Sequence, residues 1–322
     1  MGGILGAMEE NPVLVEVERS GFVESWHRGS VVGLAADGSV AVRRGTVAEP
    51  IFPRSANKPI QAVAMVRSGL GLEHELLALA GASHSGEDFH VEGVEKILAG
   101  AGLTASALRC PESWPLDASV AYDLARAGGG PDRIRMNCSG KHAAMLATCV
   151  LNEWPIETYL DPGHPLQQAV GRTVEDLCGE RPAAVGVDGC GAPLFAISLT
   201  GVARAYRALV LAEPGSPERR VADAMRAHPE WTSGSERDER RLMAGIPGLL
   251  VKAGAEGVDA FVLADGRAGV LKIDDGAWRA RTPVTVALLR ALGAPEHSVL
   301  RELAEPPLVG GDAVAGRVRA VL

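Results

Sequence analysis

The sequence predicts an α+β protein, in which an antiparallel sheet built from both ends of the chain carries an inserted helical subdomain. Residues 13–47 alternate between apolar and polar side chains and are rich in valine, a pattern typical of strands. Helical periodicity dominates the next stretch, and strand-like segments return towards the C-terminus. We therefore predict a single domain over residues 1–322, with sheet-forming segments at 12–52 and 184–322 and helices at about 57–180 between them.

The first segment is predicted to be a meander of two or three antiparallel strands. Ala36-Asp37-Gly38-Ser39 separates two strand-like runs, and an Asp-Gly pair at such a position favours a hairpin turn. After Pro53 the apolar spacing becomes helical. Helices are predicted at residues 57–68, 73–80, 88–100, 116–127, 140–152, 164–178, 197–212 and 216–227. Later strands are predicted at residues 184–187, 249–253, 258–263 and 268–273, and the charged segment 233–239 is predicted to be a mobile, solvated loop.

Composition narrows the class of protein. The formal net charge is −8 and no basic stripe offsets it, which argues against a nucleic-acid surface. No apolar run has the length of a membrane span, and Met1–Glu10 lacks the basic residues and the apolar length of a signal peptide. Five cysteines, an odd number, do not suggest a secreted disulfide framework. We expect a cytoplasmic protein that acts on a small molecule.

Lysine is scarce in this chain. Only five of the 32 basic residues are lysines, namely Lys58, Lys96, Lys141, Lys252 and Lys272. Arginine stays protonated in proteins, whereas a lysine whose pKa is lowered can act as a base or a metal ligand. The lysines within serine-bearing or glycine-rich motifs are therefore candidates for chemistry, although codon bias alone can also leave a few lysines.

Ser55 and Lys58 lie three residues apart where the strand pattern gives way to the first helix, so both fall on one face of that helix. A serine hydroxyl becomes a strong nucleophile when a neutral amine takes its proton, and burial near positive charge keeps a lysine neutral. The two residues are a candidate dyad. The alternative is an ordinary helix start, in which Ser55 caps the helix and Lys58 is solvated.

A second candidate pair combines Lys252, in Lys252-Ala253-Gly254 near the end of a predicted strand, with Ser83. The sequence S-x-x-K near the first helix, followed by lysine, a small residue and glycine on a late strand, is the pattern of penicillin-recognising enzymes and their amidase relatives. Ser83 is predicted to reach Lys252 in a crevice between sheet and helices. Ser85, two residues on, remains open as the second serine, and a solvated strand-end lysine is the alternative for Lys252.

Two cysteines and a lysine form the third candidate group. Cys138 and Lys141 lie three residues apart at a predicted helix start, and Cys190 lies in a glycine-rich turn two residues after Asp188. Two thiolates with one nitrogen or oxygen ligand suit zinc, although free buried cysteines are usually small core residues. Asp188 is a candidate for binding a substrate ammonium group, or else an Asx-turn residue that supports the loop.

Five motifs in this order resemble those of the rhizobial-type L-asparaginase II family, the class 3 asparaginases, over nearly the whole chain. They are Arg54-Ser55-x-x-Lys58-Pro59, Ala82-Ser83-His84-Ser85-Gly86-Glu87, Asn137-Cys138-Ser139-Gly140-Lys141-His142, Val187-Asp188-Gly189-Cys190-Gly191-Ala192-Pro193 and Lys252-Ala253-Gly254-Ala255-Glu256-Gly257. The family is related in fold to serine β-lactamases and glutaminases. The resemblance therefore implies a serine β-lactamase-like arrangement of sheet and helices.

The resemblance also implies an activity and a site. The implied reaction is hydrolysis of L-asparagine to L-aspartate and ammonia, and the implied assembly is a homodimer. Two Ser-Lys pairs are implied, and they map onto Ser55 with Lys58 and onto Ser83 with Lys252. An implied zinc site maps onto Cys138, Lys141 and Cys190, and the predicted substrate-binding residues are Asp188, Arg54 and His142.

We favour Ser55 as the nucleophile with Lys58 as its base, and Ser83 with Lys252 as the proton relay towards the leaving ammonia. The reverse assignment remains open. Two rival functions also remain, namely another Ser-Lys amidase of the glutaminase or β-lactamase kind, and a non-catalytic protein that binds an amino acid unchanged.

Overall fold

A computed structural model of the chain describes residues 10–322. The stretch Met1–Glu10, for which the sequence predicts no signal peptide, lies outside the described residues except for its last residue. Within the described residues, no helix combines the length and the apolar character needed to cross a membrane.

The main sheet has eight strands in the described residues, in the order β11-β12-β1-β2-β10-β9-β8, with β3 paired to β2. Every neighbouring pair in this sheet is antiparallel. Its strands are β1 (Val13–Arg19), β2 (Phe22–Leu34), β3 (Val40–Arg44), β8 (Leu250–Gly254), β9 (Val258–Val262), β10 (Ala268–Ile273), β11 (Pro307–Gly310) and β12 (Ala313–Ala320). Two small separate sheets pair β4 (Pro50–Ile51) with β7 (Ile197–Ser198) and β5 (Val185–Val187) with β6 (Pro193–Phe195).

The two ends of the chain share this sheet. Strand β1 lies between β2 and β12, with Val15 opposite His27 on one side and Ala320 on the other. Strand β2 continues into the second half, where Val32 pairs with Val270 of β10. This pairing of early and late strands confirms the predicted α+β fold class with its antiparallel sheet.

Helices occupy the positions that the sequence predicts between residues 57 and 227. They are the 3₁₀ segment η1 (Arg54–Asn57), α1 (Lys58–Arg67), α2 (His74–Ala80), α3 (Asp88–Gly100), α4 (Ala118–Arg126), α5 (Ser139–Leu151), α6 (Pro165–Cys178), α7 (Leu199–Leu211) and α8 (Pro217–Ala227). Elements without a predicted counterpart are the 3₁₀ segment η2 (Ala105–Ala107), β6, β7, α9 (Pro229–Thr232), α10 (Asp238–Gly245), α11 (Trp278–Ala291), α12 (Ser298–Ala304), β11 and β12. Strand β7 takes the first two residues of the helix predicted at 197–212.

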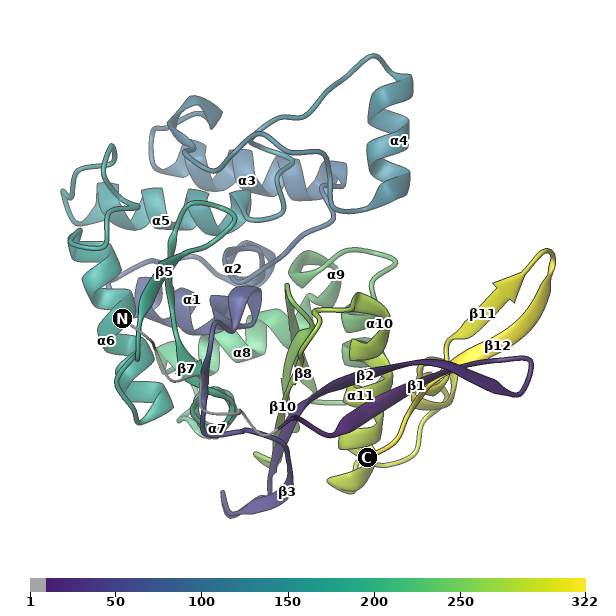
Figure 1. Cartoon of the computed structure of the whole chain (residues 1–322). Helices are drawn as coiled ribbons and strands as arrows, with labels where there is room; N and C mark the ends of the chain where they lie inside the picture. The colour runs from purple at the N-terminus through teal and green to yellow at the C-terminus, as the bar shows by residue number, and fades with distance from the viewer. Residues whose placement is uncertain (1–9) are drawn as a thin grey trace, which may run out of the picture.

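Helices cover both faces of the sheet around β9 and β10. Helices α7 and α11 both pack against these two strands, which are buried along almost their whole length. In Figure 1 the sheet is seen nearly edge-on, with α7 and α8 on its left and α10 and α11 on its right. Helices α1, α2, α3, α5 and α6 lie above and to the left, and α4 stands apart at the upper right. Burial on both faces explains why these strands are almost entirely apolar.

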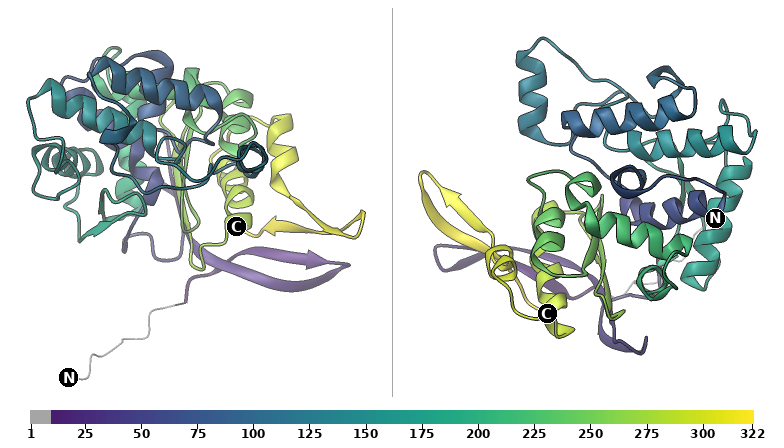
Figure 2. Two further views of the ribbon diagram at one scale, coloured as in Figure 1. Left: turned by 90° about the horizontal axis from the view of Figure 1, so that it is seen from above. Right: turned by 180° about the vertical axis from the view of Figure 1, so that it is seen from behind.

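Two hairpins at the ends of the chain project from the body (Figure 2). The β1–β2 hairpin turns at Ser20 and Gly21, whose φ angles of 51° and 79° are those of a tight two-residue turn. The predicted turn at 36–39 is present, with Gly38 at φ 89° and the Asp37 carboxylate accepting a hydrogen bond from the Ser39 amide.

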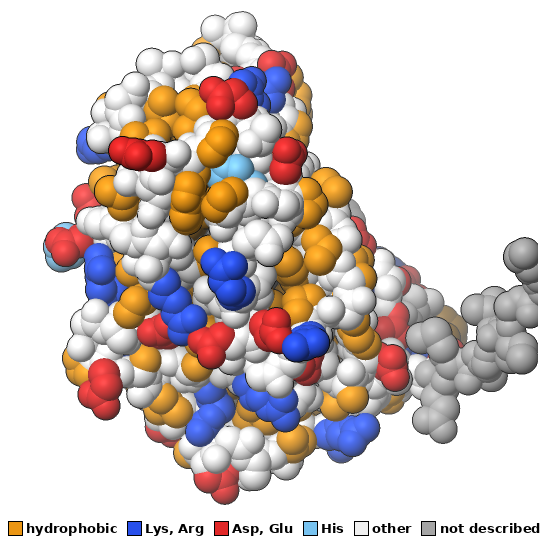
Figure 3. Space-filling view, turned by 90° about the vertical axis from the view of Figure 1, so that its left-hand side faces the viewer, with side chains coloured by type: hydrophobic (Ala, Val, Ile, Leu, Met, Phe, Trp, Pro, Cys, Tyr) orange, Lys and Arg blue, Asp and Glu red, His pale blue; other side chains and the backbone are white. Residues whose placement is uncertain are grey.

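On the face over α5, α6 and β5, acidic and basic side chains are interspersed, and the basic ones form no broad block (Figure 3).

Candidate active site

Three segments that are distant in the sequence meet around the Ser83 hydroxyl. Lys58 is the first residue of α1, Ser83 lies in the loop after α2, and Lys252 is the middle residue of β8. The Ser83 Oγ atom lies 2.9 Å from Lys58 Nζ and 2.9 Å from Lys252 Nζ. Both lysines are 1% exposed and Ser83 is 8% exposed. The structure therefore brings three of the four residues of the predicted Ser-Lys pairs together in one buried, hydrogen-bonded group.

The glycine that follows Lys252 explains how β8 reaches this position. A Cβ atom added to Gly254 would lie 2.5 Å from the Pro53 carbonyl oxygen, so only glycine lets the end of β8 pack against η1. The contact holds the strand that carries Lys252 against the segment that carries Ser55. The structure uses this glycine for close packing of one backbone segment against another.

The two lysines have different environments. Burial lowers the pKa of Lys252 well below its usual value, the charge of Lys58 lowers it further, and Glu239 opposes both effects. Lys58 Nζ also donates to the Ala82 carbonyl at 2.6 Å, and Lys252 Nζ donates to the Ala253 carbonyl at 2.8 Å. Two ammonium groups beside one hydroxyl repel each other, so a charge on Lys58 disfavours a second charge on Lys252.

Ser55 lies beside this chain without being bonded to it. Its side chain is half-buried in η1, and it makes no hydrogen bond to any residue in the range 10–322, since Lys58 Nζ is directed to Ser83. Its neighbour Arg54 has φ 52°, a left-handed conformation that a non-glycine residue adopts only under strain. The predicted Ser55–Lys58 contact is therefore not formed in this structure, although both residues lie at the same helix start.

Ser83, rather than Ser85, is the serine next to the lysines. Ser85 is almost fully buried and its hydroxyl donates to the Ser233 carbonyl at 3.1 Å. The prediction of a mobile loop at 233–239 is wrong, because this segment is fixed to the loop that carries both serines. The Ser235 amide and hydroxyl donate to the Glu87 carboxylate at 2.9 and 2.7 Å, and a Cβ on Gly234 would lie 2.0 Å from Ser85 Oγ.

The predicted metal ligands also lie together. Lys141 of α5 donates to Cys190 Sγ at 3.1 Å, and Cys138 immediately precedes the same helix. A hydrogen bond from Cys138 and the charge of Lys141 lower the pKa of Cys190, against the effect of burial. The hydrogen bond with Cys190 and burial raise the pKa of Cys138. Burial alone would lower the pKa of Lys141, but the charges of Cys190 and Cys138 raise it.

This cluster fits zinc only if the lysine serves as a ligand. In the part of the chain that the structure describes, no three or more His, Cys, Asp or Glu side chains are grouped to hold a metal ion. Two buried sulfur atoms and one buried amine are donors of the kind that zinc prefers. The His142 ring lies near this cluster, since Cys190 and Lys141 both act on its pKa. Its buried Nε2 has no hydrogen-bond partner among the described residues, while Nδ1 bonds the Tyr159 hydroxyl at 2.7 Å.

The predicted substrate-binding residues are engaged with one another or buried. The Arg54 Nε atom donates to Asp188 Oδ1 at 2.8 Å, and its Nη1 atom lies 3.5 Å from Glu256 Oε1. His142 is fully buried, and burial lowers its pKa. Asp188 and Arg54 form an ion pair that a charged ligand can exchange, whereas His142 reaches no open surface here.

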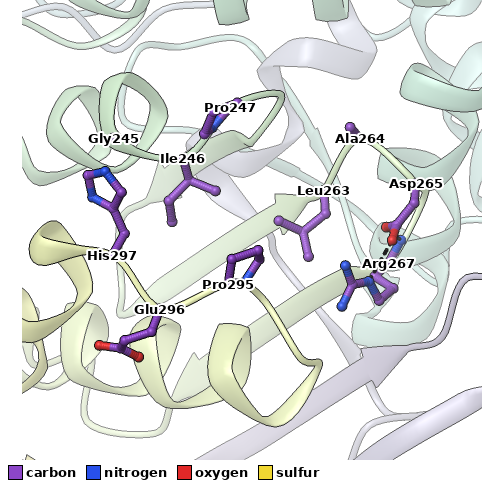
Figure 4. Close-up of a pocket in the computed structure, with 10 residues that line it drawn as sticks. All are labelled: Gly245, Ile246, Pro247, Leu263, Ala264, Asp265, Arg267, Pro295, Glu296 and His297. Atoms are coloured by element: carbon purple, nitrogen blue, oxygen red, sulfur yellow. Dashed lines mark hydrogen bonds and ion pairs between the residues drawn. The ribbon is translucent and has the colours of Figure 1, made fainter.

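Two hollows clarify where small molecules can enter. One, of about 490 Å³, lies beside Arg54 and is lined also by Phe52, Val187, Glu256 and Lys272. The other, of about 310 Å³, lies between the end of α10, the β9–β10 turn and the loop before α12 (Figure 4). None of the predicted site residues lines this second pocket. The hollow next to Arg54 is lined by a predicted substrate-binding residue, and Ser55 follows Arg54 in the chain.

Sequence reasoning missed the charges packed near Lys252. Glu239, Arg281 and Asp259 are each at most 3% exposed. No sequence signal distinguishes Arg281, because Arg279 and Arg290 lie in the same helical segment and arginines are mostly exposed.

Comparison with known proteins gives one extensive match. A family model described as L-asparaginase II matches residues 15–320. A comparison with curated proteins gave no match. Among solved structures, the chain is similar to "EstCE1, a hydrolase with promiscuous acyltransferase activity", with a TM-score of 0.40, 13% identity, and coverage of 87% of this chain and 92% of that one. It is also similar to a β-lactamase from Burkholderia vietnamiensis, with a TM-score of 0.34, 16% identity, and coverage of 86% and 91%. At such scores neither structure bears on the function.

Proposed function

Because this chain belongs to the L-asparaginase II family, we propose that it hydrolyses L-asparagine to L-aspartate and ammonia through paired serine and lysine side chains. Membership of the family supports a hydrolase that acts on amides. The observation that carries the proposal is the placement of the Ser83 hydroxyl 2.9 Å from the amines of both Lys58 and Lys252. A hydroxyl between two buried amines is suited to moving protons.

In the proposed reaction, Ser55 Oγ attacks the side-chain amide carbon and its proton passes to neutral Lys58. The C–N bond then breaks, and the leaving ammonia takes a proton supplied through Ser83. Water opens the resulting ester of Ser55, giving L-aspartate and restoring the serine. Ser55 suits the attacking role because it is the less buried of the two serines.

Lys58 must be neutral at the moment of attack, and the chain of hydroxyl and amines provides a route. Both amines lie 2.9 Å from Ser83 Oγ. Burial lowers the pKa of Lys252, so we assign the neutral form to Lys252 in the proposed resting state. If Ser83 passes its proton to Lys252 and takes one from Lys58, the shared proton moves to Lys252 and Lys58 becomes a base. The number of protons in the site is unchanged.

Substrate binding is proposed for Arg54 and Asp188, which form an ion pair at 2.8 Å in the free protein. An amino acid carries both a carboxylate and an ammonium group, so it can replace each partner of this pair with its own charge. His142 is proposed to support the substrate-binding residues from the buried side of the site.

Cys138, Lys141 and Cys190 are proposed to hold zinc. A bound zinc ion would supply a positive charge that orients a polar end of the substrate. The active assembly is proposed to be a homodimer.

The proposal is tested by measuring ammonia release from L-asparagine and L-glutamine beside hydrolysis of a chromogenic β-lactam. We expect turnover of L-asparagine, and a loss of about a thousandfold or more for Ser55→Ala, since a nucleophile is removed. Full turnover by both Ser55→Ala and Ser83→Ala would contradict the serine mechanism. Binding of L-asparagine without ammonia release would indicate an amino-acid-binding protein instead.

Zinc content is tested by metal analysis of the purified protein. We expect zinc in the unmodified protein and little in Cys190→Ser. Cys149→Ser is the matched control, because Cys149 is also buried but lies in the core at the far end of α5. Equal metal content in both variants would contradict the proposed ligands.

A further inference from the structure

A group of buried charges lies outside the proposed reaction. Arg281 of α11, Glu239 of α10 and Asp259 of β9 are 1%, 3% and 3% exposed. Arg281 Nη2 lies 3.4 Å from Glu239 Oε1, and Arg281 Nε lies 3.2 Å from Asp259 Oδ1. Arg237 adds a second contact to the same Glu239 oxygen, at 3.2 Å. Burying a charge costs several kcal/mol even when it is paired, so this group needs a reason beyond packing.

Several polar atoms of this group lack hydrogen bonds, which is unusual for a network that only supports the fold. Glu239 Oε2, Arg281 Nη1 and Arg237 Nε are buried and have no hydrogen-bond partner among residues 10–322. Buried polar groups that only stabilise a fold are usually fully bonded. The two arginines instead lie over the ring of Trp278, with Arg281 at 4.0 Å and Arg237 at 4.8 Å from its centre.

Of this group, Glu239 lies on the helix beside Lys252, because α10 packs against β8. Asp259 of β9 lies opposite Ala253, so its side chain is on the other face of the sheet from Lys252, whose cross-strand partner is Ala260. Figure 1 shows α10 beside β8 with α11 just below. Charges of both signs act on Lys252. Burial lowers its pKa the most, the charges of Lys58, Arg237 and Arg281 lower it further, and the charge of Glu239 raises it.

Glu239 is the carboxylate of this group that keeps its negative charge. Burial would raise its pKa, but Arg281 and Arg237 lower it to about 2, so its carboxylate remains charged at all physiological pH values. Burial raises the pKa of Asp259 to about 6, so that residue loses its charge in mildly acidic solution. A constant negative charge near one of two amines that share a proton favours the proton on the nearer amine.

We propose that Glu239 is a positioning residue that draws the shared proton of the lysine pair towards Lys252, and so populates the form in which Lys58 is the neutral base for Ser55. This inference rests on the proposed function. It also assigns Arg237 and Arg281 a defined part, because they keep Glu239 ionised and limit how far Lys252 is protonated.

The direct test follows the lysine signals by NMR in protein with isotope-labelled lysine. The chain has only five lysines, and Lys252→Met identifies the Lys252 signal by its loss. We expect Glu239→Gln to lower the pKa of Lys252 further, by about one unit, and Arg237→Gln to raise it. Asp238→Asn is the matched control, because it removes a carboxylate from the adjacent position of α10 that bonds Thr282, and it should leave Lys252 unchanged.

Activity provides the second readout. If Glu239→Gln makes the reactive form about tenfold rarer, kcat should fall about tenfold, KM should change little, and the acidic limb of the kcat profile should move to higher pH. Thermal unfolding of each variant checks that it is folded, and Arg237→Gln keeps the test decisive if Glu239→Gln does not fold.

An unchanged Lys252 titration in folded Glu239→Gln, or shifts of the same sign in Glu239→Gln and Arg237→Gln, would overturn the inference. A protein whose Lys252 signal shifts as expected but which releases no ammonia from L-asparagine would overturn the proposed function and support the assignment of Glu239.

Discussion

Lys141 and Lys252 are equally buried, each 1% exposed, yet burial has opposite outcomes for them. Lys252 shares the Ser83 hydroxyl with another lysine, and the pKa of Lys252 is lowered by burial and by that neighbour. At Lys141 burial again acts to lower the pKa, but the sulfur atoms of Cys190 and Cys138 reverse the result. The comparison shows that the neighbours of a buried lysine, and not its depth, decide whether it is a proton acceptor or a fixed cation.

The largest expected effect concerns catalysis at Lys252. Lys252→Arg keeps a positive side chain but can no longer take the shared proton, because a guanidinium stays protonated. We expect kcat for ammonia release to fall by about a thousandfold. Lys96→Arg, on the exposed side of α3, is the control and should retain full activity. Near-normal turnover by Lys252→Arg would show that Lys252 need not be neutral.

The next effect concerns stability at Lys141. Lys141→Met leaves the Cys190 sulfur without its charged partner in the interior, and we expect a loss of about 3 kcal/mol in the free energy of unfolding of the metal-free protein. Denaturant unfolding at pH 7 measures it, and exposed Lys96→Met serves as reference. An unchanged midpoint would mean that the Lys141–Cys190 pair contributes nothing.

The smallest expected effect is a gain in stability at Lys252, opposite in sign to the loss expected at Lys141. Lys252 binds a proton more weakly in the folded than in the unfolded chain, so unfolding takes up a proton between its lowered pKa and the unfolded value of about 10.4. Stability therefore rises with pH across that window. Lys252→Met removes this penalty and should stabilise the protein by about 1 kcal/mol at pH 7, a gain that shrinks as pH approaches 10. Destabilisation by Lys252→Met at pH 7 would contradict the conclusion that the two buried lysines affect stability in opposite directions.

Much of this contrast could be predicted from the sequence, because motifs identify residue types that local spacing brings together. Cys138 and Lys141 share a helix start, and the scarcity of lysine indicated which lysines to examine. The meeting of Lys58, Ser83 and Lys252 was predicted only as two separate pairs. A single serine bonded to both amines depends on how the loop after α2 packs, and no local pattern encodes that.

The fold shows the same division between local and distant information. Helices between residues 57 and 227 follow from their periodicity, whereas Arg237 and Glu239 were predicted to be solvated because charged residues in a polar segment usually are. Their burial depends on Arg281 and Trp278, some forty residues further on. The strand β12 also had no predicted counterpart, and its partner β1 lies at the other end of the chain.

That pairing of β1 with β12 has a consequence for how the protein is made. Val15 pairs with Ala320, so one edge of β1 lacks its neighbour β12 until almost all of these residues have left the ribosome. Lys252 likewise emerges long after Ser55, and the two cannot meet earlier. We expect nascent chains to expose the edge of β1 during most of synthesis, which makes them clients for chaperones and makes late truncations prone to aggregate.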